Sequence, residues 1–353
     1  MNRFETRINK LRTKLNGIDA LYISGKPNVA YFTGTKGYDT ALYITQKEAW
    51  VITDFRYREM AQSLTWLTYY ETDAGHKTTD FLNSRPENRI GLEKDRLSLS
   101  QYLAFKEKCP CKEFVPVDDI VLDLREVKDE YEIEATRKAC SIAMEAFDHM
   151  CGYLRPGLTE KEAAAELEHF MKTHGADDLS FDTILITGAK TSLPHGVPGN
   201  DVIKEGDFVT MDYGCKVDGY CSDETRTVAI GRPTQEMRDV YNIVLEAQLN
   251  ACDNIKAGIT GKEADSLARD VIEKAGYGEY FGHSLGHGTG LEIHENPRYA
   301  QTWTEPIKAG TIVSIEPGIY LPKKFGVRIE DLALVTETGI INFVTAPKEL
   351  IIL

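Results

Sequence analysis

Four carboxylates in the second half of the chain have the residue type and spacing that a divalent metal site needs. They are Asp212, Asp223, Glu316 and Glu330. The first and third close the apolar runs 207–211 and 311–315, where a buried carboxylate is costly unless it is paired or binds a cation. The second and fourth follow across turn-rich segments, so each pair has the spacing of a hairpin.

Histidines cluster in the same half, in a segment rich in glycine. His283, His287 and His294 fall within twelve residues, and His195 precedes them in the sequence. The glycines disfavour a helix and let the backbone approach a ligand closely. Four carboxylates with one imidazole suit two divalent cations such as Mn, Fe, Co or Zn, which can share a hydroxide nucleophile and polarise a carbonyl. The remaining histidines could stabilise an oxyanion or hold substrate, so we predict a dinuclear metallohydrolase.

An internal repeat puts these residues in two equivalent halves. The aligned segments are 154–163 with 255–264, and 204–214 with 308–318. Thr159 and Thr260 are the expected N-caps of equivalent helices, and Asp212 matches Glu316. The period of about 100 residues is too long for a solenoid. We expect a duplicated half-domain with an active site between the halves. Unrelated surface acids are the alternative, but two pairs at equivalent places argue against it.

The elements that must position this site divide the chain into two parts. Strand-like runs are expected at 20–23, 41–44 and 49–52, with another near 91–93, and helices near 3–15, 56–64 and 98–107. An amphipathic helix over 128–150 would open the second part. We therefore expect a small α/β domain, residues 1–122, followed by an α+β catalytic domain, residues 123–353.

Composition narrows the class of protein. The 353 residues include 41 Lys+Arg and 55 Asp+Glu, a net charge of −14, which argues against nucleic acid or an anionic membrane as partner. No apolar run approaches the ~18 residues of a membrane span. The seven cysteines lack a disulfide framework, and the charged N-terminal segment is unlike a secretory signal. We expect free thiols and a cytoplasmic protein.

Five motifs, in order, make the second domain resemble the pita-bread metallopeptidases, which include methionine aminopeptidase, aminopeptidase P and prolidase. The motifs are MDYG at 211–214, DETRT at 223–227, GHGTG at 286–290, IEPG at 315–318 and VRIE at 327–330. The first domain is similar to a creatinase-type N-terminal domain through NVAYFTG at 28–34 and ITDFRY at 52–57. The resemblance implies a pita-bread fold for the catalytic domain.

This resemblance implies a set of metal ligands. They are Asp212, Asp223, His287, Glu316 and Glu330. Asp223 and Glu330 would bridge two ions, Asp212 would serve one ion, and His287 with Glu316 would serve the other. Glu316 would also be the general base.

The resemblance also implies substrate-site residues. His294 would steady the developing oxyanion, while His195 and His283 would hold the scissile region and the proline side. Arg328 matches an arginine near the site of the proline-directed members, and support of a salt bridge is its alternative role.

The expected function is hydrolysis of the bond between an N-terminal residue and proline, by an aminopeptidase P or an Xaa-Pro dipeptidase (prolidase). The complete ligand set disfavours creatinase and a non-catalytic peptide-binding module, and the first domain disfavours methionine aminopeptidase. These stay as alternatives. The resemblance further implies two divalent ions and a homodimer. Manganese is the expected metal, and cobalt, zinc or iron would also suit the ligands. The sequence leaves open whether the Xaa-Pro peptides are dipeptides or longer.

Overall fold

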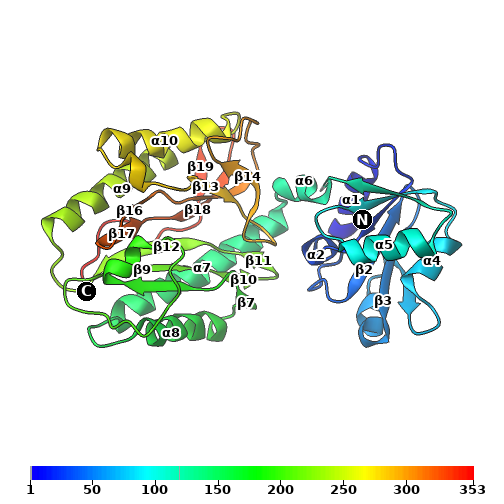
Figure 1. The fold of residues 1–353 in the computed structure, drawn as a ribbon, viewed down its shortest axis with the longest axis horizontal. Coiled ribbons are helices and arrows are strands. Elements are labelled where there is room, and N and C mark those ends of the chain that lie inside the picture. The colour runs from blue at the N-terminus through cyan, green and yellow to red at the C-terminus, as the bar shows by residue number, and fades with distance from the viewer. Residues whose placement is uncertain (1, 119) are drawn as a thin grey trace. The chain divides into compact units, whose positions relative to one another are not determined.

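The computed structural model describes residues 2–118 and 120–353, and the chain forms two compact units, Met1–Arg125 and Glu126–Leu353. Figure 1 shows both units in ribbon form, and each is described by itself. Among the residues that the structure describes, no helix combines the length and apolar character required to cross a membrane.

The N-terminal unit is built on a mixed six-stranded sheet with the strand order β4-β3-β2-β1-β5-β6. Its elements are α1 (Arg3–Arg12), β1 (Ala20–Ile23), α2 (Lys26–Thr33), β2 (Thr40–Thr45), β3 (Ala49–Asp54), α3 (Arg58–Ser63), β4 (Thr68–Thr72), α4 (Thr78–Ser84), β5 (Arg89–Glu93), α5 (Leu99–Lys108), β6 (Glu113–Val117) and α6 (Ile120–Glu126). The central strand β1 pairs antiparallel with β2 and parallel with β5. This arrangement confirms the expected α/β organisation.

The strands that sequence reasoning found here are the buried ones. The runs at 20–23, 41–44, 49–52 and 91–93 are confirmed as β1, β2, β3 and β5. The edge strands β4 and β6 were not predicted, because each is only partly buried and lacks a continuous apolar run. The predicted helices correspond to α1, α3 and α5, with α1 ending early at Arg12.

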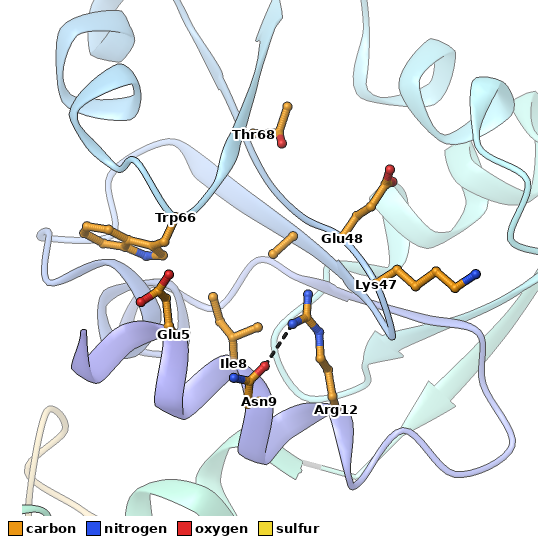
Figure 2. Close-up of a pocket in the computed structure, with 9 residues that line it drawn as sticks. Glu5, Ile8, Asn9, Arg12, Lys47, Glu48, Trp66 and Thr68 are labelled. Carbon is orange, nitrogen blue, oxygen red and sulfur yellow. Dashed lines mark hydrogen bonds between the residues drawn. The ribbon is translucent and has the colours of Figure 1, made fainter. Parts of the chain in front are cut away.

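A hollow of about 310 Å³ lies on the surface of the N-terminal unit (Figure 2). Its lining residues are Glu5, Ile8, Asn9, Arg12, Lys47, Glu48, Ala49, Trp66 and Thr68. Arg12 donates from Nη1 to Oδ1 of Asn9 over 2.9 Å, and from Nε to the carbonyl oxygen of Thr45 over 2.9 Å. The lining of this hollow contains both acidic and basic side chains, Glu5 and Glu48 with Arg12 and Lys47.

The C-terminal unit places its helices outside short sheets. Its helices are α7 (Glu130–Tyr153), α8 (Glu160–Thr173), α9 (Gln235–Asn254) and α10 (Gly261–Lys274). Its strands are β7 (Asp178–Leu179), β8 (Ile184–Thr187), β9 (Phe208–Tyr213), β10 (Cys215–Val217), β11 (Tyr220–Cys221), β12 (Glu224–Ala229), β13 (Gly286–Gly288), β14 (Glu295–Tyr299), β15 (Ile312–Ile315), β16 (Gly318–Leu321), β17 (Phe325–Arg328), β18 (Asp331–Val335) and β19 (Ile340–Asn342). In Figure 1, α9 and α10 lie on one side of the strands and α8 lies on the other.

The internal repeat is visible in the local structure. Thr159 and Thr260 cap α8 and α10 with the same capping box, as the sequence predicts. Two hydrophobic cores lie in this unit, one dominated by α7 and α8 and the other by α9 and α10. The strands of the two equivalent pairs, β9 with β12 and β15 with β18, contribute side chains to both cores.

The two halves meet where the strand pairs end. Thr225 on β12 forms a β-bridge with Glu330, which immediately precedes β18. The buried Arg226 donates from Nη1 to the carbonyl oxygen of Glu330 and from Nη2 to Oδ1 of Asp331 over 2.8 Å. The central strands of the two halves therefore lie directly beside one another, with their carboxylates at the junction.

Candidate active site

Strand pairing brings the four carboxylates to one place. Asp212 lies on β9 opposite Thr225, and Asp223 immediately precedes β12. Glu316 follows β15, and Glu330 precedes β18 in the equivalent position of the second half. The carboxylates of each pair lie on or beside antiparallel neighbours, β9 with β12 and β15 with β18. The predicted turns fall in hairpins between these strands, β10–β11 and β16–β17.

His287 lies among these carboxylates. Its Nε2 atom is 3.6 Å from Oδ2 of Asp223 and 3.3 Å from Oε1 of Glu316. Ligand atoms of Asp223, His287 and Glu330 lie within 4.8 Å of one another. The Nδ1 atom of His287 faces the carbonyl oxygen of Gly288 over 3.1 Å, so the network favours a proton on Nδ1 and leaves Nε2 free to bind a cation.

Asp212 has one oxygen engaged and one without a partner. Arg328 donates from Nη2 to Oδ2 of Asp212 over 2.6 Å. Oδ1 is buried and has no hydrogen-bond partner among the residues that the structure describes. A buried carboxylate oxygen of this kind is costly unless a proton or a cation meets it.

Burial sets the electrostatics of the cluster. It raises the pKa of Asp212 and raises the pKa of Glu316 to about 7. It also raises the pKa of Asp223 and Glu330 well above their usual range, and neighbouring carboxylates add to that rise. Burial, followed by the adjacent His294, lowers the pKa of His287 to about 3. Four carboxylates whose ionised forms are disfavoured by burial, beside a neutral imidazole, fit divalent cations, because cations would stabilise the ionised carboxylates.

The other three histidines predicted for the site are His195, His283 and His294. His283 Nε2 lies 2.9 Å from the hydroxyl oxygen of Tyr320, and burial lowers the pKa of His283 to about 4. The ring of His294 is exposed, and its centroid is 4.4 Å from that of His287. His195 is exposed on the segment that follows β8, within electrostatic reach of Asp212, His283 and His294.

Arg328 is buried and connects the carboxylate cluster with Tyr320, which contacts His283. Besides Asp212, it donates from Nη1 to the hydroxyl oxygen of Tyr320 over 2.8 Å and from Nε to Oγ1 of Thr225 over 3.0 Å. Thr225 in turn donates to Oε2 of Glu330 over 2.6 Å. These contacts include the salt bridge to Asp212, which is the alternative role that the sequence offers for an arginine near the site.

Sequence reasoning missed three polar residues that hold the cluster. They are Thr225, Ser314 and Tyr320. Ser314 donates to Oε1 of Glu316 over 3.0 Å and accepts from the backbone N–H of His287 over 3.1 Å. Alternation along the strand could have found Ser314, two residues before Glu316. Thr225 stands within the DETRT motif, whereas nothing in the local sequence marks Tyr320.

This fold and cluster correspond to a known class of enzyme. Residues 134–337 match the model of metallopeptidase family M24, and residues 7–127 match the creatinase/prolidase N-terminal domain. The chain belongs to metallopeptidase family M24, so it is a divalent-metal peptidase of the pita-bread fold. The resemblance and the fold class inferred from the motifs are confirmed.

Individual relatives match this chain over nearly its whole length. The Xaa-Pro dipeptidase structure from Bacillus anthracis is 42% identical, with a TM-score of 0.96, and the match covers 99% of this chain and 100% of that chain. The X-Pro aminopeptidase structure from Thermotoga maritima is 39% identical, with a TM-score of 0.91 and coverage of 97% and 100%. The Xaa-Pro dipeptidase of Pyrococcus furiosus is 42% identical over 346 residues, which are 95% of this chain and 96% of that protein.

Proposed function

We propose that this protein is a metal-dependent exopeptidase that hydrolyses the bond between an N-terminal residue and proline. The observation that carries the proposal is the position of His287 Nε2, within 3.6 Å of Asp223 and 3.3 Å of Glu316 inside a recessed group of carboxylates. The Xaa-Pro dipeptidases and X-Pro aminopeptidase among its relatives support the choice of substrate.

The proposed ligands of two divalent ions are Asp212, Asp223, His287, Glu316 and Glu330. Asp223 and Glu330 would each hold both ions, as the family resemblance implies, and their ligand atoms lie with that of His287 within 4.8 Å of one another. The ions would supply a water of lowered pKa and polarisation of the scissile carbonyl. Manganese is the proposed metal, because four carboxylates with one imidazole form an oxygen-rich donor set.

The chain's own groups would manage protons and orientation. Glu316 is the proposed general base, and a pKa of about 7 is suited to accepting a proton near neutral pH. His294, exposed beside His287, would donate a hydrogen bond to the developing oxyanion. His283, held by Tyr320, and His195 would orient the substrate around proline, whose nitrogen offers no N–H in the scissile amide.

An assay with two lengths of substrate tests this function. Purified protein would be incubated with Gly-Pro, Ala-Pro and an Xaa-Pro-Pro peptide, with added Mn²⁺ or with a chelator. Metal-dependent cleavage restricted to the dipeptides would identify a dipeptidase, and cleavage of the longer peptide would identify an aminopeptidase. Failure to cleave any Xaa-Pro bond, together with cleavage of a peptide that begins with Met-Ala, would overturn the proline assignment.

We also propose a homodimer located in the cytoplasm. The sequence supports a reducing compartment, because the spacing of its seven cysteines forms no disulfide framework. Light scattering during size exclusion would give the mass directly, and 39.6 kDa is the mass of one chain. A mass near that value in the metal-loaded protein would contradict the dimer.

A further inference from the structure

The segment that carries His195 is an irregular stretch between β8 and the β-bridge at Val202. It begins with a short 3-10 helix, Gly188–Ser192. Leu193 and Val197 flank His195 and are 54% and 76% exposed. An irregular stretch with apolar side chains in solvent needs anchors at its ends to hold one conformation. We call residues 188–201 the His195 loop.

Glu160, at the first position of α8, contacts the two ends of this loop. Its side chain is fully buried. Oε1 accepts from the backbone N–H of Thr187 over 2.9 Å, just before the loop. Oε2 accepts from the backbone N–H of Gly199 over 2.7 Å and from Nζ of Lys190 over 2.5 Å. One carboxylate thus ties the beginning, the 3-10 helix and the end of the loop together.

The backbone at the start of α8 reinforces the far end of the loop. The N–H of Glu160 donates to the carbonyl oxygen of Asp201 over 3.0 Å, and the N–H of Lys161 donates to that of Gly199 over 3.1 Å. A Cβ at Gly199 would lie 2.9 Å from Nζ of Lys190. The loop therefore closes tightly over the Glu160–Lys190 ion pair.

The internal repeat shows that the helix itself does not require this glutamate. The residue equivalent to Glu160 in the second half is Gly261, also at the first position of its helix. A Cβ at Gly261 would lie 2.0 Å from the carbonyl oxygen of Arg298, so backbone occupies that space. The buried carboxylate is therefore specific to the half that carries His195. The ion pair of this carboxylate is partly exposed, since the side chain of Lys190 is 22% exposed, so it contributes little net stability. The contacts of the carboxylate with the loop backbone therefore favour a role in orientation.

We propose that Glu160 is a positioning residue for substrate binding, which fixes the His195 loop and thereby the place of His195 beside the metal centre. Glu160 touches neither substrate nor metal in this scheme. The proposal rests on the proposed function for the reaction that His195 serves. Because the proposal concerns the conformation of the His195 loop, hydrogen exchange can test it without a measurement of peptidase activity.

Two variants of the anchor test the proposal. Glu160→Gln replaces an acceptor oxygen with an NH₂ group that cannot accept from backbone N–H groups or pair with Lys190. Lys190→Met leaves the glutamate intact and removes its ion-pair partner in the 3-10 helix. The matched control is Asp201→Asn, because Asp201 is 64% exposed and is the other partner of Lys190, at 3.1 Å. Hydrogen exchange, bound metal and steady-state kinetics would be measured for each full-length variant loaded with Mn²⁺.

We expect amide exchange within residues 187–199 to accelerate about tenfold or more in both anchor variants, because either a buried acceptor oxygen or its ion-pair partner is lost. We expect KM for Ala-Pro to rise by about tenfold, with a smaller change in kcat and wild-type metal content. Asp201→Asn should behave as wild type. Unchanged exchange in the loop, or lost metal with unchanged KM, would overturn the proposal. Absence of Xaa-Pro cleavage in the wild-type protein would instead refute the proposed function, and the exchange measurement would still decide the role of Glu160.

Discussion

Arg328 and Asp212 form a buried contact in which Nη2 donates to Oδ2 over 2.6 Å. The arginine fixes the orientation of the carboxylate and leaves the buried Oδ1 without a partner among the described residues. With Oδ2 held by the arginine, the buried Oδ1 is the oxygen of Asp212 that would be available to a cation. Arg328 would therefore orient Asp212 for its proposed role as a metal ligand.

Arg328→Lys should lower metal affinity by about 10–100-fold, the usual effect of losing a group that orients a ligand. Lysine carries the charge but cannot contact Asp212, Thr225 and Tyr320 together as the planar guanidinium does. Titration of the metal-free protein with Mn²⁺ would measure the change. Arg232→Lys, at an exposed position, is the control. Equal affinity in the two variants would contradict the supporting role.

Asp223→Ala should abolish peptidase activity and reduce bound metal, because it removes a proposed bridging ligand. Metal per chain would be measured by elemental analysis after gel filtration, beside the activity on Ala-Pro. Glu337→Gln controls for the loss of one negative charge at an exposed site. An Asp223→Ala protein with full activity would show that the metal ligands have been assigned wrongly.

His294→Ala should lower kcat by about 10²–10³-fold while metal stays bound, the size of effect seen when an oxyanion donor is removed. His169→Ala, on the exposed face of α8, is the matched histidine control. Kinetics and metal content would be determined on the same preparations. Loss of metal in the His294 variant would assign this histidine to the ligands instead.

Metal binding should release protons, and more of them at about pH 6 than at about pH 8, because burial raises the pKa of Glu316 to about 7. Below that pKa the metal-free site holds a proton that the cation must displace. Apparent affinity should therefore rise with pH across this range, by about tenfold per pH unit for each proton displaced. Calorimetric titration in buffers of different ionisation enthalpy counts the protons. A binding enthalpy independent of buffer at the lower pH would contradict this account.

Local signals in the sequence were sufficient for much of the fold. Buried strands such as β1 and β2 appear as short apolar runs, and Thr159 and Thr260 mark helix starts through residues three positions away. The edge strands β4 and β6 were missed because half-exposed edges tolerate polar residues. The buried strands and the helix starts depend on residues close together in the chain, so a local pattern of residues can predict them.

The sequence by itself determined the family, the two-domain organisation that motifs imply, and the residue types available for a metal site, because these follow from motifs and from a repeat along the chain. Only the tertiary structure decided which partners complete the site. Tyr320 joins His283 to Arg328, and Glu160 ties Thr187 to Gly199, through contacts between segments far apart in sequence. Such contacts depend on how strands pair and how helices pack, and no local pattern of residues encodes them.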